Sequence, residues 1–157
     1  MEKQKDNPGI HLPPPFIYAI VFFIAMLVQN YIPISSSYLE TKAVQIAARV
    51  FIFISPFISL TAIIQFIRTK TTVMPFKPAS SLQTTGVYSF TRNPMYLGLL
   101  SLYIGLSLMF INWWDIIFIP VIIILINTLV IKNEEKYLER TFGQTYLDYK
   151  KKVGRWL

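Results

Sequence analysis

Two short polar clusters stand out in a chain that is otherwise rich in apolar side chains. The first is the Thr-Arg-Asn-Pro-Met-Tyr run at 91–96. Asn93 followed by Pro94 is typical of a helix start, because asparagine is a good N-cap and proline fits the first helical position. The free N–H groups of such a start favour a bound anion such as a carboxylate, although the pair can also mark a helix start and nothing more.

The second cluster is the Asn-Glu-Glu-Lys-Tyr-Leu run at 133–138, which follows an apolar run that ends at Ile131. A carboxylate at Glu134 would lie where a helix leaves the lipid. There it can face a cleft and accept hydrogen bonds from ribose hydroxyls or an ammonium group. The alternative is that Glu134, Glu135 and Glu139 form a solvated face paired with Lys136 and Arg140.

Much of the usual catalytic chemistry is absent from this chain. It contains no cysteine, which excludes disulfides and thiolate catalysis, and its single histidine, His11, lies in a proline-rich N-terminal stretch. We therefore expect no metal site.

The elements that position the two clusters are predicted to be membrane helices. Of the 157 residues, 54% are hydrophobic and 15% are charged, against about a quarter charged in ordinary soluble domains. Uncharged apolar runs cover residues 16–34, 50–67, 96–114 and 116–131. A helix needs about 20 residues to cross a bilayer, and the fourth run reaches that length if its helix continues past Lys132.

We expect one all-α domain over 1–157, an integral-membrane bundle with spans at about 15–34, 46–68, 94–112 and 115–140. The last two spans would form a hairpin that turns at 112–115.

The distribution of basic residues predicts the orientation. Of 15 lysines and arginines, only Lys42 and Arg49 lie between the first two runs. The positive-inside rule then places both termini and the 68–94 connection in the cytoplasm. The expected membrane is a bacterial inner membrane or the endoplasmic reticulum. The same bias explains the net charge of +7, so no nucleic-acid partner is expected. The tail at 144–157 interleaves aromatic and basic residues, as in an interfacial helix on an anionic membrane, and it could also fold back over a cofactor pocket.

The order of the motifs resembles a known family. Thr-Thr-Gly-Val-Tyr at 84–88 and Arg-Asn-Pro-Met-Tyr-Leu-Gly at 92–98 precede the hairpin, and Glu-Glu-Lys-Tyr-Leu at 134–138, Phe-Gly at 142–143 and Tyr-Leu-Asp-Tyr at 146–149 follow it. From about Leu82 onward the chain resembles the integral-membrane methyltransferases related to isoprenylcysteine carboxyl methyltransferase and the phospholipid N-methyltransferases.

The resemblance implies S-adenosylmethionine as cofactor, in a pocket at the cytoplasmic side. It also implies a lipophilic or prenylated methyl acceptor, taken up from the lipid bilayer. The residues implied to bind the cofactor are Leu82, Gln83, Tyr88, Asn93, Pro94, Met95, Tyr96, Glu134 and Glu135. Glu134 and Arg92 are the residues expected to take part in catalysis.

Two departures from the carboxyl methyltransferase pattern keep the acceptor open. Where that pattern has Arg-His-Pro, this chain has Arg-Asn-Pro at 92–94, and Val130 stands where the eukaryotic enzymes have a substrate-binding arginine. The alternatives are a phosphatidylethanolamine-type N-methyltransferase and a non-enzymatic four-helix membrane protein.

Overall fold

The computed structural model describes residues 8–10, 12–35, 37–68 and 81–157. His11 and the first part of the connection between the second and third predicted spans lie outside the described residues. All regular structure in the described ranges is helical. Its elements are α1 (Pro14–Tyr31), α2 (Lys42–Arg68), the 3-10 turn η1 (Gly86–Ser89), α3 (Pro94–Met109), α4 (Trp113–Ile117), α5 (Ile119–Leu125), the π-helical turn η2 (Ile126–Ile131), α6 (Lys132–Phe142) and α7 (Gln144–Lys152).

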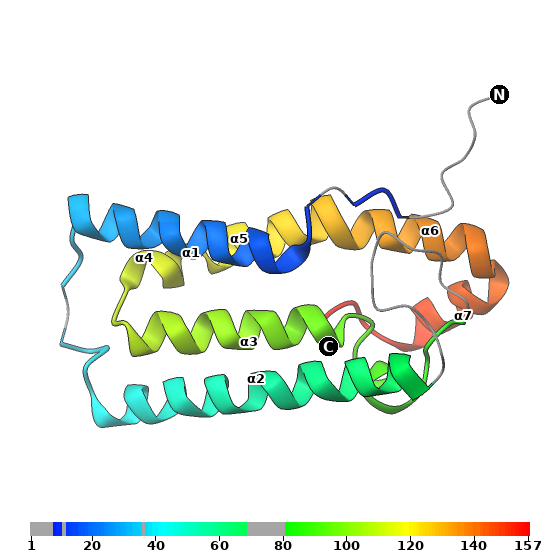
Figure 1. Ribbon diagram of the computed structural model, residues 1–157, viewed down its shortest axis with the longest axis horizontal. Coiled ribbons are helices and arrows are strands. Elements are labelled where there is room, and N and C mark those ends of the chain that lie inside the picture. Colours follow the sequence, from blue (N-terminus) through cyan, green and yellow to red (C-terminus); the bar gives the residue numbers. More distant parts are fainter. Residues whose placement is uncertain (1–7, 11, 36, 69–80) are drawn as a thin grey trace.

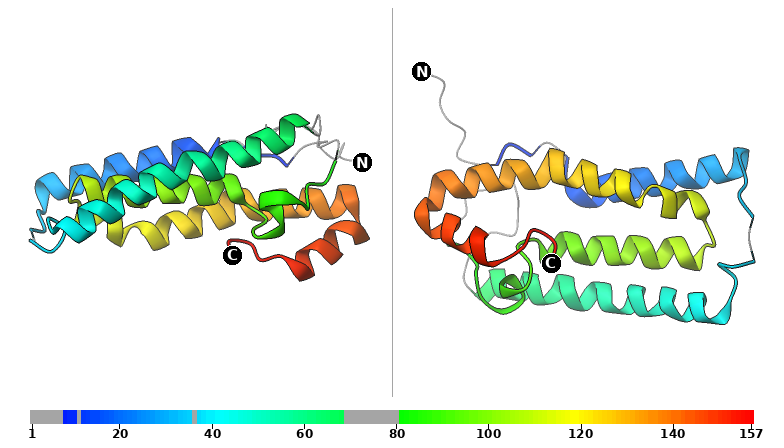
Figure 2. Two further views of the ribbon diagram at one scale, coloured as in Figure 1. Left: turned by 90° about the horizontal axis from the view of Figure 1, so that it is seen from below. Right: turned by 180° about the vertical axis from the view of Figure 1, so that it is seen from behind.

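The long helices lie alongside one another in an elongated bundle. Helices α1, α2, α3 and the series from α4 to α6 run along its long axis (Figures 1 and 2). Helix α6 continues past the start of α3, and α7 folds back beside it (Figure 1). The residues of both polar clusters therefore lie towards the same end of the molecule.

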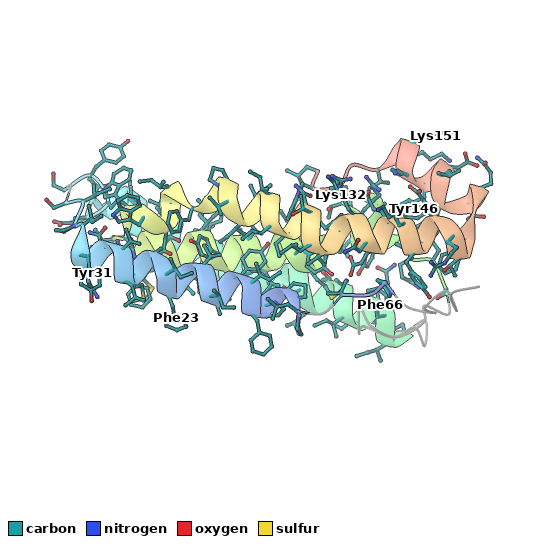
Figure 3. The ribbon with its side chains drawn as sticks, turned by 90° about the horizontal axis from the view of Figure 1, so that it is seen from above. Phe23, Tyr31, Phe66, Lys132, Tyr146 and Lys151 are labelled. Atoms are coloured by element: carbon teal, nitrogen blue, oxygen red, sulfur yellow. The ribbon has the colours of Figure 1, made fainter. Side chains whose placement is uncertain are left out.

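Helices α1 and α2 are each long and apolar enough to cross a membrane. Helix α3 is apolar but has 16 residues, fewer than a full crossing needs by itself. Large apolar side chains point outward along these helices; Phe23, for example, is 63% exposed and points away from the bundle (Figure 3). The fold is thus all-helical with membrane-type helices, and the four-span arrangement stays a prediction.

The stretch predicted as one span at about 115–140 forms a series of consecutive helical segments. The structure divides this stretch at Phe118, which separates α4 from α5, and it adopts π geometry over Ile126–Ile131. Pro120, near the start of α5, has no N–H to donate to the preceding turn, which explains why α4 stops before it. The last helix of the series ends at Phe142, close to the predicted end at 140.

The predicted hairpin is present. Helix α3 ends at Met109 and α4 begins at Trp113, with the Asn112 side chain accepting hydrogen bonds from the backbone N–H groups of Trp114 and Asp115. Asn112 is therefore the N-cap that begins the return helix.

Small residues let α2 and α3 pack closely. A Cβ built on Gly98 would collide with the Ser59 hydroxyl, and one built on Gly105 would lie 2.9 Å from the Ala48 carbonyl oxygen. Ser101 donates a hydrogen bond to the Phe51 carbonyl oxygen across the same interface, at 2.9 Å. Gly98 and Gly105 of α3 therefore allow its close packing against α2.

Gly105→Ala is expected to destabilise the protein by about 1–3 kcal/mol, the usual cost of overpacking a tight interface. The added methyl would meet backbone atoms of α2, which cannot move aside as a side-chain end can. Thermal unfolding in detergent measures the effect. Met109→Ala, at an exposed position of the same helix, is the control and should change stability little. Equal unfolding midpoints for the glycine variant and the wild type would contradict the prediction.

Candidate functional site

The two polar clusters meet where α3 and α6 begin. The Tyr96 hydroxyl, in the first turn of α3, donates a hydrogen bond of 2.6 Å to Glu134 Oε1, in the first turn of α6. Tyr96 is buried, and its backbone carbonyl accepts a further bond from the Tyr18 hydroxyl of α1. Three helices thus fix the position of this tyrosine and of the carboxylate that it contacts.

Glu134 lies in an electrostatic environment that suits a functional carboxylate. Helix α6 follows the apolar run that ends at Ile131, so this carboxylate lies just beyond that run. Burial of the carboxyl group raises the pKa of Glu134 to about 7, and the hydrogen bond from Tyr96 acts in the opposite direction. A group with such a pKa changes protonation near neutral pH, which is typical of functional sites.

Glu135, the next residue along α6, has a different role. Its carboxylate lies 3.0 Å from Arg92 Nη1 and accepts two hydrogen bonds from Arg155, at 2.9 and 2.7 Å. Burial alone would raise the pKa of Glu135, but the hydrogen bond from Arg155 and the charges of Arg92, Arg155 and Lys150 hold it below its usual value. The solvated-face alternative is therefore wrong for Glu135, which is only 7% exposed.

Two buried polar atoms next to these carboxylates have no hydrogen-bond partner among the described residues, namely the Tyr88 hydroxyl and Arg92 Nε. Tyr88 is 5% exposed, and both burial and the nearby Glu134 charge raise its pKa. Buried polar groups in proteins are nearly always hydrogen-bonded. A polar ligand that reaches Tyr88 and Arg92 would supply the missing partners, so the residues present fit a cofactor with charged and hydroxyl groups.

The remaining predicted site residues surround this centre. Pro94 begins α3 as predicted, and Met95 follows it in the same turn. Asn93 precedes the helix, but its side chain does not cap it; the amide instead donates to the Arg155 carbonyl oxygen, at 2.8 Å. The expected side-chain cap is therefore absent, and the amide contacts the C-terminal segment instead.

Leu82 and Gln83 lie in the segment that leads to η1. Leu82 packs against the buried cluster of Tyr146, Tyr149 and Val153. The Gln83 side chain is buried and donates to the Ser81 hydroxyl, at 2.9 Å. These contacts connect the segment to its neighbours, and binding of the cofactor by either residue stays a prediction.

The sequence analysis did not identify Tyr146 and Arg155 as residues that complete the site. Arg92 Nη1 donates to the Tyr146 hydroxyl at 3.1 Å, and Arg155 is the main partner of Glu135. Both belong to the aromatic and basic tail, for which folding back over the pocket was one of two interpretations. The contacts agree with that interpretation, since the tail lies against the segment before α3 and against α6.

The fold and the site together describe an all-helical membrane-type protein with two adjacent glutamates, the partly exposed Glu134 and the buried Glu135, at one end of its bundle. Residues 43–145, more than half of the chain, match the family described as phospholipid methyltransferase. The chain belongs to this family.

Two relatives can be compared with the chain. It is 38% identical over 73 residues to the Saccharomyces cerevisiae protein-S-isoprenylcysteine O-methyltransferase, in a match that covers 46% of this chain and 30% of the yeast protein. It is 41% identical over 63 residues to an uncharacterized protein of Haemophilus influenzae, in a match that covers 40% of this chain and all of that protein. The chain thus matches less than a third of the length of the yeast relative. No solved structure matches it.

Proposed function

We propose that the protein is an S-adenosylmethionine-dependent membrane methyltransferase that transfers a methyl group to a lipophilic, prenylcysteine-like acceptor. The observation that carries this proposal is the contact between Tyr96 and Glu134, beside the Tyr88 hydroxyl and Arg92 Nε, which lack a hydrogen-bond partner in the part of the chain that the structure describes. Family membership and the similarity to the yeast O-methyltransferase support it.

When bound, S-adenosylmethionine supplies a methyl group already activated by its sulfonium, so the protein mainly has to position the reactants and exclude water. In this proposal the Glu134 carboxylate accepts hydrogen bonds from the hydroxyls or ammonium group of the cofactor. Tyr88 and Arg92 Nε donate to its acceptor groups. Glu135 contributes indirectly, because its ion pair with Arg92 orients that guanidinium.

The site also suggests how a water-soluble cofactor and a lipophilic acceptor could meet. We infer that α1, α2, α3 and the α4–η2 series cross the membrane, with both termini and the site on the cytoplasmic side. The cofactor would then enter from the cytoplasm, and the acceptor would enter from the bilayer. The membrane would be a bacterial inner membrane or the endoplasmic reticulum.

One observation favours a second candidate function, N-methylation of a phospholipid such as phosphatidylethanolamine. A carboxylate acceptor needs no general base, whereas an ammonium group must lose a proton before it attacks. The pKa of Glu134, raised to about 7 by burial, suits a group that takes up such a proton near neutral pH.

Transfer of labelled methyl from S-adenosylmethionine in lipid vesicles tests both candidates. With an S-farnesylated cysteine derivative, we expect a labelled methyl ester that mild alkali releases as methanol. Label in phosphatidylethanolamine that resists alkali would instead support the second function. No transfer to either acceptor by the folded protein would contradict the proposal. Cysteine without the prenyl group is the matched control, and it should react much more slowly, because it cannot enter from the bilayer.

A further inference from the structure

The last residues of the chain connect several parts of the site. After α7 ends at Lys152, the chain turns back towards the start of α3. The backbone N–H of Arg92 donates to the Gly154 carbonyl oxygen at 3.0 Å, and the Thr91 hydroxyl donates to the Arg155 carbonyl oxygen at 3.3 Å. We call residues 153–157 the C-terminal strap; its backbone is thus bound to the segment that leads into α3.

The side chains of the strap reach two further elements. Arg155 holds Glu135 of α6 by two hydrogen bonds. The Trp156 indole Nε1 donates to Asn127 Oδ1 of η2 at 3.2 Å, and its ring packs against the buried core between the long helices. The strap therefore joins the segment before α3, α6 and η2.

Asn127 is an unusual residue at its position. It is a polar side chain inside the uncharged apolar run 116–131, and a polar group in a membrane span needs a partner in the protein. Trp156 provides that partner. The residue also lies in the π-helical turn, a deviation that occurs frequently at functional sites.

We propose that Trp156 and Asn127 are positioning residues for cofactor binding. Their hydrogen bond anchors the strap to the membrane part of the bundle, and the anchored strap keeps Arg155 against Glu135 and holds the 91–93 segment at the start of α3. Arg92 and Glu134 then face the cofactor in a fixed arrangement. This inference rests on the proposed function.

Calorimetric titration of S-adenosylhomocysteine into the detergent-purified protein tests the inference. Trp156→Phe keeps an aromatic ring for packing and removes the N–H donor, and Asn127→Leu removes the acceptor. Each is expected to weaken binding about five- to tenfold, in line with the loss of one hydrogen bond. The double variant should bind no worse than the weaker single variant, because the two residues act through one bond. Asn127→Gln, which keeps a neutral amide oxygen as acceptor, should lose less affinity than Asn127→Leu.

Trp114→Phe is the matched control. The Trp114 indole also donates to one acceptor, the Ile32 carbonyl oxygen at 2.8 Å, but at the opposite end of the bundle. This variant should lower the thermal unfolding midpoint about as much as Trp156→Phe and leave ligand affinity unchanged. Wild-type affinity in Trp156→Phe, or an equal loss in Trp114→Phe, would overturn the inference and leave the proposed function intact. Absence of binding by the folded wild type would overturn both.

Discussion

Replacing Glu134 with glutamine is expected to lower the affinity for S-adenosylhomocysteine about 10- to 150-fold, while the thermal unfolding midpoint stays the same or rises. A hydrogen bond to a charged group contributes about 1.5–3 kcal/mol, and the amide keeps the size of the side chain without its charge. Stability should not fall, because burial disfavours the charged carboxylate in the folded protein. Calorimetry and thermal unfolding at pH 8 measure the two effects separately.

The pH dependence of Glu134 gives a second measurement of the same prediction. With a pKa of about 7, the ionised fraction of Glu134 falls about tenfold from pH 8 to pH 6, and ligand affinity should fall with it. The raised pKa also means that the folded state holds this proton more tightly than the unfolded state. The contribution of Glu134 to stability therefore improves as pH falls from above 7 towards 4.5. Glu134→Gln should lack both effects.

Glu40→Gln provides the matched control for this substitution. Glu40 is an exposed glutamate just before α2, at the opposite end of that helix from the site. Its replacement should leave affinity, pH profile and stability unchanged. If Glu134→Gln bound the ligand as tightly as the wild type did, the assignment of Glu134 to the cofactor site would have to be abandoned.

Local sequence signals predicted the elements that carry the site. The Asn-Pro pair identified the start of α3 at Pro94, and the apolar runs identified the long helices. These features depend on residues close together in the chain. The contact between Tyr96 and Glu134 spans 38 residues, and no local signal gives the register in which α3 meets α6. Only the resemblance to a family placed both residues in one pocket.

The errors arose where partners come from distant parts of the chain. Charges three or four residues apart on one helix suggested a solvated face for Glu135, yet its strongest partner, Arg155, lies 20 residues further on. The sequence also contained no signal that the Asp115 side chain, at the hairpin, is fully buried and accepts a hydrogen bond from Tyr103, at 3.0 Å. The spacing of residues in the sequence predicts neighbours on one helix, but the packing of several helices determines which charged side chains are buried.

The replacement with the largest expected effect on stability is Glu135→Ala. The Arg92 side chain is 9% exposed, and the variant would leave this buried guanidinium without its carboxylate. Removing one partner of a buried ion pair costs about 3–5 kcal/mol, so we expect the unfolding free energy to fall by about 3 kcal/mol or more. Thermal unfolding in detergent at pH 7 measures it. Asp148→Ala is the matched control, because Asp148 and Lys151 form an ion pair whose side chains are 53% and 74% exposed, and its loss should leave the unfolding midpoint nearly unchanged.

The pH dependence of this loss distinguishes Glu135 from its neighbour. Because the ion pairs lower the pKa of Glu135 below 4.5, the stability it contributes is complete above that pH and disappears as pH falls through the lowered pKa. The difference in unfolding free energy between Glu135→Ala and the wild type should therefore become smaller in acid. The contribution of Glu134 to the unfolding free energy instead increases as pH falls from 7 to 4.5. Slopes of the same sign at both positions would contradict the assignment of one glutamate to an ion pair and the other to a buried binding site. Opposite slopes at adjacent residues are expected because the Glu135 carboxylate faces two arginines, whereas the Glu134 carboxyl group is desolvated by burial and faces the Tyr96 hydroxyl.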